Sequence, residues 1–114
     1  MKTYIFFFTK HGGETALKIN EALLQEGVES RIFTTVRQVE KNKLFETPPH
    51  GFSVLAAEAF SQKNVLIVVG AAGIAVRLVA PLVKRKDSDS PVLVADEKGT
   101  FVIPLLSGHI GGAN

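Results

Sequence analysis

Cysteine is absent from this sequence of 114 residues. Its absence excludes disulfide bonds, thiolate zinc sites and a cysteine nucleophile. It is also consistent with the reducing cytoplasm, where we expect the protein to act. Three histidines are present, at His11, His50 and His109, but their spacing is not that of metal ligands. We therefore expect no metal site in this chain.

Long apolar runs and an excess of charge are missing as well. No run approaches the roughly 20 apolar residues that a membrane-spanning helix needs. The first apolar run, residues 4–8, is too short for a signal peptide and is not followed by a cleavage site of small residues. The net charge is only +2, and basic and aromatic residues do not interleave along any stretch. These features argue against a membrane or a nucleic acid as a partner.

Hydrophobic residues are plentiful, at 46%, which is enough to form the core of one domain of ordinary size. Their runs and alternations predict five strands, at residues 4–8, 31–35, 65–69, 91–95 and 100–105. The last two strands are joined by Asp96-Glu97-Lys98-Gly99, which predicts a hairpin. Residues 37–50 are polar, end close to two prolines and are interpreted as a loop.

Three helices are predicted between these strands. The first begins after Gly13 and ends at Gly27, with apolar and charged residues on opposite faces. The second covers residues 52–60, where apolar side chains recur at i, i+3, i+4, i+7 and i+8. The third, residues 74–83, is apolar almost all round. That pattern predicts a buried helix, which Pro81 ends or kinks.

Alternating strands and helices predict an α/β fold of three layers, with a mostly parallel sheet of about five strands and a C-terminal β-hairpin. This arrangement is flavodoxin-like or Rossmann-like. With right-handed crossovers, the strands at 4–8 and 65–69 are neighbours. Residues 1–114 are expected to form a single domain. Because a turn of small residues after a strand ordinarily opens a further element, we expect this domain to be the truncated N-terminal part of a longer protein.

Two glycine-containing turns follow the neighbouring strands. The first runs from Gly70 to Gly73 into an apolar helix, where backbone N–H groups at the helix N-terminus can hold an anion. Only the pattern G-x-x-G is present, so close strand–helix packing explains this turn equally well. The second turn offers Lys10, His11 and Gly12 at the same sheet edge. A solvated loop is the simpler interpretation of each residue, but two converging turns favour a binding site.

Arg77, Asp96 and Glu97 are further candidates for chemistry. Arg77 is the only charge within the apolar helix, and a buried guanidinium needs a carboxylate or an anionic ligand. Otherwise its side chain reaches the surface; we favour a functional role because Arg77 follows closely on Gly73. Asp96 and Glu97 are suited to acid–base chemistry. A hairpin turn is the better interpretation of Glu97, and for Asp96 the two interpretations are balanced.

Near the end of the sequence, Ser107-Gly108-His109 places a hydroxyl two residues from an imidazole. Residues at that separation seldom form the hydrogen bond that a serine nucleophile needs, so His109 is better interpreted as a general base or a ligand contact. A simple hairpin would direct the end of the last strand away from Gly70. The turn at Gly70 and the motif Ser107-Gly108-His109 could then line one site only if the chain bends further, or if a partner domain or a second subunit contributes. A homodimer is therefore one of the alternatives.

An ordered series of motifs runs through the second half of the sequence. It comprises GAAGIAVR (70–77), APL (80–82), DSDSPV (87–92), VADEKG (94–99), FVI (101–103) and LLSGHIGGAN (105–114). The series resembles the N-terminal domain of the cobalt-precorrin-5A hydrolase family, and the clear similarity covers about residues 50–114.

The resemblance implies a role in anaerobic cobalamin biosynthesis. Members of this family open the δ-lactone of cobalt-precorrin-5A, release acetaldehyde and yield cobalt-precorrin-5B. The cobalt arrives within this corrinoid substrate, so no separate cofactor is expected. The acetate and propionate carboxylates of a corrinoid suit the glycine turns, Arg77 and the basic run Lys84–Lys86.

For the hydrolysis of a lactone we expect His109 or Asp96 to activate water. Arg77 and the backbone N–H groups near Gly73 would hold a carboxylate or a developing oxyanion. The expected substrate-binding set is completed by Gly70, Ser107, Gly108, His11 and Gly12. Family members continue into a C-terminal domain, which is the expected partner. The alternative is a non-catalytic module that binds the corrinoid or docks on that domain; a nucleotide-binding domain is disfavoured by the incomplete glycine pattern.

Overall fold

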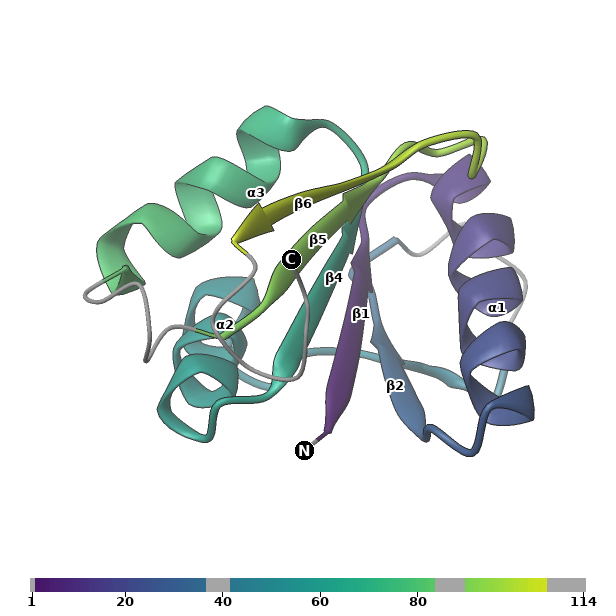
Figure 1. Ribbon diagram of the computed structural model, residues 1–114, viewed down its shortest axis with the longest axis horizontal. Helices are drawn as coiled ribbons and strands as arrows, with labels where there is room; N and C mark the ends of the chain where they lie inside the picture. Colours follow the sequence, from purple (N-terminus) through teal and green to yellow (C-terminus); the bar gives the residue numbers. More distant parts are fainter. Residues whose placement is uncertain (1, 37–41, 84–89, 107–114) are drawn as a thin grey trace.

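A mostly parallel sheet organises the part of the chain described by the structure, a computed structural model of residues 2–36, 42–83 and 90–106 (Figure 1). The strands within these residues are β1 (Thr3–Phe7), β2 (Ser30–Phe33), β3 (Phe45–Glu46), β4 (Val65–Val69), β5 (Val92–Ala95) and β6 (Val102–Leu106). They lie in the order β3-β2-β1-β4-β5-β6, with β1 to β5 parallel and β6 antiparallel to β5. The predicted α/β fold with a C-terminal hairpin is confirmed.

Helices cover both faces of the sheet. Those in the described residues are α1 (Lys10–Gln25), α2 (Phe52–Ser61) and α3 (Ala72–Val79), with a 3-10 turn, η1 (Ala80–Leu82), directly after α3. α1 packs on one face and α2 and α3 pack on the other, which confirms the three layers (Figure 1). Pro81 lies in η1 and ends α3 as predicted, because proline lacks the N–H that would continue the helix. None of these helices has the length and apolar character needed to cross a membrane.

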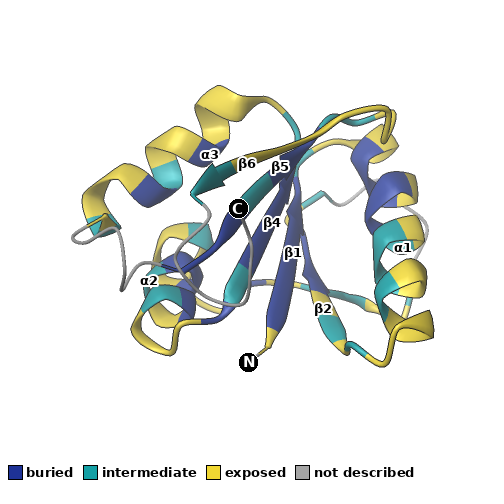
Figure 2. Cartoon of the chain, viewed as in Figure 1, coloured by how far each residue is buried: buried dark blue, intermediate teal, exposed yellow. Residues whose placement is uncertain are grey.

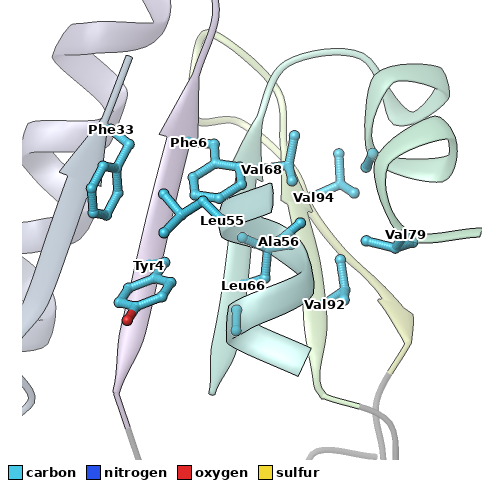
Figure 3. Close-up of a cluster of buried hydrophobic side chains, with 12 residues drawn as sticks. Tyr4, Phe6, Phe33, Leu55, Ala56, Leu66, Val68, Val79, Val92 and Val94 are labelled. Atoms are coloured by element: carbon cyan, nitrogen blue, oxygen red, sulfur yellow. The ribbon is translucent and has the colours of Figure 1, made fainter. Parts of the chain in front are cut away.

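Side chains alternate along β1 and so contribute to a core on each face of the sheet. Tyr4 and Phe6 point towards α2 and α3, whereas Ile5 and Phe7 point towards α1. Phe6 is fully buried, and its ring centroid lies 4.9 Å from that of Phe52 on α2. Figure 3 shows the cluster on the α2 and α3 face. Burial of one such aromatic side chain stabilises a fold by roughly 1.5–3 kcal/mol, so these clusters hold both helical layers against the sheet.

The first helix starts earlier than predicted. Thr9 is its N-cap, and the Thr9 side-chain oxygen accepts a hydrogen bond of 3.2 Å from the backbone N–H of Gly12. This bond satisfies one of the amides that a helix start leaves unpaired. α1 therefore begins at Lys10, and Gly12 and Gly13 lie inside its first turns rather than before it.

The end of the first helix is as predicted. Gly27 has a φ of 77°, in the left-handed region that favours glycine. The N–H of Gly27 donates to the carbonyl of Leu24 at 2.9 Å, and that of Val28 donates to Leu23 at 2.8 Å. These two bonds form a Schellman motif, which satisfies carbonyls at the end of α1.

The interpretation of residues 37–50 as a loop is wrong at β3. Phe45 pairs with Ile32 of β2, and the Phe45 ring centroid lies 4.8 Å from that of the buried Phe7. A strand of two residues shows no sequence period, so only its packing against β2 and β1 reveals it.

The prediction of a helix buried all round is also wrong. In α3 only Ala75 and Val79 are buried, whereas Ile74 is 38% exposed and Val76 is 45% exposed. The buried residues belong to the core shared with α2 and the sheet. The apolar sequence predicted the helix correctly. It did not show that, within the described residues, no other element covers the outer side of α3 (Figure 2).

Candidate functional site

The strand order reverses between β1 and β4. These strands are parallel neighbours with Phe7 opposite Val69, which confirms the predicted adjacency. From β1 the chain enters α1 on one face, and from β4 it enters α3 on the other face (Figure 1). Open α/β sheets bind ligands at the carboxyl ends of the strands where the order reverses. We call residues 8–13, 70–74 and 96–99, which follow β1, β4 and β5, the carboxyl edge.

Gly12 and Gly13 at the carboxyl edge allow α1 to pack closely on the sheet. Both are buried. A Cβ atom at Gly12 would lie 3.3 Å from Cβ of Phe7 and 3.5 Å from Cγ1 of Val69. One at Gly13 would lie 3.2 Å from the Phe7 ring. The structure thus gives Gly12 a packing role, whatever the adjoining amides bind.

The start of α3 is arranged differently. Its N-cap, Ala71, has no side chain that can bond to the helix amides. Gly73 is exposed, and a Cβ atom built on it would meet nothing within 4 Å. Gly70 has a φ of 155°, and its N–H donates to the carbonyl of Ala95 at 2.8 Å, which fixes the turn against β5. The first amides of α3, at Ala72 and Gly73, therefore have no side-chain cap at the positive end of the helix dipole.

Arg77 lies one helical turn beyond Gly73. The separation of four residues places both on the same side of α3, and long side chains on a helix lean towards its N-terminus. Arg77 is exposed, so its side chain reaches the surface and the argument from a buried charge does not apply. Gly73 and Arg77 are thus both exposed on α3, one helical turn apart.

Asp96 is bonded within the hairpin. Its Oδ1 accepts a hydrogen bond of 2.7 Å from the N–H of Phe101, and its carbonyl accepts one of 2.9 Å from Gly99. The Thr15 hydroxyl of α1 donates to the carbonyl of Glu97, so the hairpin tip rests on α1 (Figure 1). The turn interpretation of Asp96 and Glu97 is therefore observed. Asp96 nevertheless lies at the carboxyl edge, because β5 is the neighbour of β4.

The last described strand runs away from this edge. β6 returns beside β5, so that Val102 lies opposite Ala95 and Leu106 lies opposite Val92, at the other end of the sheet. The predicted site residues Ser107, Gly108 and His109, and the basic run Lys84–Lys86, lie outside the described residues. Of the predicted set, the structure brings to one edge only Gly12, His11, Gly70, Gly73 and Asp96, with Arg77 one turn away.

Residues 2–36, 42–83 and 90–106 contain no group of three or more His, Cys, Asp or Glu that could hold a metal ion. They contain one ion pair, between Arg31 of β2 and Glu46 of β3, with N–O distances of 2.6 and 2.9 Å. Hydrogen bonding to Arg31 lowers the pKa of Glu46, and the same bond raises the pKa of Arg31. This pair joins two strands at the edge of the sheet and takes no part in the carboxyl edge.

Sequence reasoning missed two contacts that shape the carboxyl edge. The cap at Thr9 had a detectable signal, a threonine immediately before the amphipathic pattern. The bond from Thr15 to Glu97 joins residues 82 apart in the sequence and had none.

Comparison with known proteins shows the family to which this chain is similar. Residues 54–114, more than half of the chain, match the family described as Cobalamin synthesis G N-terminal. A cobalt-precorrin-5A hydrolase from Salmonella typhimurium is 58% identical over 64 residues, covering 56% of this chain and 18% of the relative. One from Priestia megaterium is 37% identical over 110 residues, covering 93% of this chain and 28% of the relative.

A solved structure shares the fold. The crystal structure of a cobalamin biosynthesis protein G homolog from Sulfolobus solfataricus superposes with a TM-score of 0.69 at 23% identity, covering 99% of this chain and 31% of that one. The chain thus spans less than a third of the length of each of these relatives. With its three-layer fold and the motifs between residues 54 and 114, the chain belongs to the Cobalamin synthesis G N-terminal family.

Proposed function

We propose that this chain is the N-terminal domain of a cobalt-precorrin-5A hydrolase of the cytoplasm. The whole protein would open the δ-lactone of cobalt-precorrin-5A with water and release acetaldehyde, giving cobalt-precorrin-5B. The family match over residues 54–114 carries this proposal, because the same residues include β4, α3 and β5 and thus residues 70–74 and 96–99 of the carboxyl edge.

Within that reaction, the carboxyl edge is proposed to hold a carboxylate of the corrinoid. The uncapped amides at Ala72 and Gly73 supply N–H donors, and Arg77 supplies a charged donor one turn further along α3. Helix N-termini bind carboxylates in this manner. The open space at Gly73 supports close approach, because no side chain lies within 4 Å of the position that its Cβ would take.

The assignment of the water-activating group stays a proposal. His109 lies outside the described residues, and Asp96 uses Oδ1 to hold the hairpin. That hydrogen bond favours a second candidate function, a module that grips the corrinoid while other parts of the full-length protein perform the chemistry. Turnover of the full-length protein separates the two functions: the catalytic role requires a loss in Asp96→Asn or in His109→Ala, and the binding role requires a loss in neither.

Titration of the 114-residue chain with a cobalt corrinoid that bears free carboxylates tests the binding step. Calorimetry and visible absorption report the Kd, and the corresponding corrinoid amide is the ligand control. Loss of a charge-assisted hydrogen bond costs about 1.5–3 kcal/mol, so Arg77→Ala should weaken binding about tenfold to a hundredfold.

Lys2→Ala is the matched control variant, since Lys2 is an exposed cation before β1, at the opposite end of that strand. An unchanged Kd in Arg77→Ala, or an equal loss in Lys2→Ala, would remove Arg77 from the proposed site.

A further inference from the structure

The two edges of the sheet differ in how they are protected. β3 is only two residues long and ends in Glu46, which is paired with Arg31. Short strands and charged side chains are the ordinary means by which proteins prevent an edge from pairing with another chain. β6, at the other edge, has five residues and no charge. Two features of β6 hinder pairing with another chain: Pro104, and the register shift beside it, where Pro104 lies opposite Leu93 but Leu106 lies opposite Val92.

β6 has the sequence of an interior strand. Val102 lies opposite Ala95, whose side chain joins the core on the α1 face, and Ile103 lies opposite Val94, which joins the core on the α2 and α3 face. Continuous apolar sequence is typical of strands covered on both faces. Yet Val102 is 58% exposed, Ile103 is 56% exposed and the adjoining Phe101 is 67% exposed (Figure 2). We call Phe101, Val102 and Ile103 the β6 surface.

We propose that the β6 surface is the docking site for the polypeptide that follows this N-terminal region in the full-length protein. The matched family is N-terminal by its description, and the chain covers 18% and 28% of two cobalt-precorrin-5A hydrolases. β6 is the last strand among the described residues. Because such a segment is covalently linked to the domain, its effective concentration at the β6 surface is in the millimolar range. Its docking also avoids the loss of translational freedom that the association of two separate molecules requires.

A second copy of the chain fits the β6 surface less well. Two β6 strands related by a twofold axis would form one antiparallel ladder that contains Pro104 twice. On an edge strand, the proline nitrogen, which carries no N–H, ordinarily lies on the unpaired side of the strand. A ladder between two copies would therefore lack one hydrogen bond from each copy. Apolar side-chain contacts with a different segment do not depend on that donor.

Hydrogen exchange tests the proposal without any corrinoid, so its outcome is independent of the proposed activity. The 114-residue chain is compared with a chimaera in which the same residues replace the matching N-terminal part of the Salmonella typhimurium hydrolase. Peptides that cover residues 100–106 should exchange at least tenfold more slowly in the chimaera. Peptides that cover residues 42–47 are the internal control, because Leu44 is also apolar and 52% exposed.

Two variants separate docking from folding. Ile103→Glu and Leu44→Glu both place a charge at an exposed apolar position, so neither should alter the stability of the 114-residue chain appreciably. In the chimaera, only Ile103→Glu should restore fast exchange in residues 100–106. If the chimaera is insoluble, the full-length Salmonella typhimurium protein is compared with its own N-terminal fragment over the aligned segment.

Equal exchange rates in the fragment and in the full-length protein would overturn the proposal. Slow exchange in the 114-residue chain alone, with protection that rises with concentration and a dimeric mass, would also overturn it in favour of a second copy.

Discussion

Two glycines of the carboxyl edge, Gly12 and Gly73, should respond to alanine in opposite directions. At Gly12 the added Cβ would lie 3.3 Å from Cβ of Phe7 and 3.3 Å from the hydroxyl of its own cap, Thr9. Cβ of Phe7 is fixed to the backbone, and Oγ1 of Thr9 is held by its hydrogen bond from Gly12, so these neighbours or α1 must shift by a few tenths of an ångström. Overpacking of this kind destabilises by about 1–3 kcal/mol. The helix propensity of alanine offsets about 0.5–1 kcal/mol of that loss, which leaves a net loss of up to about 2.5 kcal/mol.

Gly73 has no such neighbour, because its Cβ would meet nothing within 4 Å and its backbone is helical. Gly73→Ala should therefore raise the free energy of unfolding by about 0.4–1 kcal/mol, through the smaller entropy of the unfolded chain. Urea unfolding of the 114-residue chain followed by circular dichroism measures both changes.

Corrinoid titration of the same variants separates packing from binding. In the folded fraction, Gly12→Ala should retain the wild-type Kd, whereas Gly73→Ala should weaken binding, since its methyl group stands beside the amides that hold the carboxylate. Stability changes of the same sign would refute the packing argument. An unchanged Kd in Gly73→Ala would refute the proposed approach of the ligand to α3.

Three further predictions concern other parts of the fold. Asp96→Ala should lower the free energy of unfolding by about 0.5–1.5 kcal/mol, because Oδ1 of Asp96 accepts a hydrogen bond from the N–H of Phe101. Asp96→Asn keeps an acceptor oxygen and should retain most of this stabilisation. Equal losses of stability in the two variants would contradict the turn role. The pKa of Glu46 is lowered in the folded state by its bond to Arg31, so the stabilisation by this pair is present above the ordinary pKa of 4.5 and is lost as pH falls through the folded value. Both side chains are more than a third exposed, at 52% and 38%. The stability difference between wild type and Glu46→Gln should therefore stay below about 1 kcal/mol, and should shrink on acidification in urea titrations at pH 7 and pH 3. Phe6→Ala should cost about 3–5 kcal/mol, because Phe6 is fully buried against Phe52; a loss under 1 kcal/mol by thermal unfolding would show that the core is misassigned.

Much of the candidate site followed from the sequence. The glycine-containing segments after residues 4–8 and 65–69 were expected at one edge, and β1 and β4 are neighbours with both segments at the same end, although Gly12 and Gly13 lie inside α1 and not in a turn before it. The roles of the individual glycines were not predictable, because Gly12 and Gly73 differ only in what surrounds them. The sequence left two interpretations of Asp96 open, and the hydrogen bond to Phe101 shows its role in the turn.

Local pattern by itself determined the five longer strands, the three helices, the stop at Gly27 and the hairpin at residues 96–99. Each of these depends on side-chain period or on a residue with special backbone freedom, and both are visible in a single segment. Only the tertiary structure decided that Phe45 extends the sheet, that α3 has an exposed side and that the hairpin tip rests on Thr15. Those features depend on contacts between segments far apart in the chain, because burial and pairing belong to the assembled layers and not to any one segment.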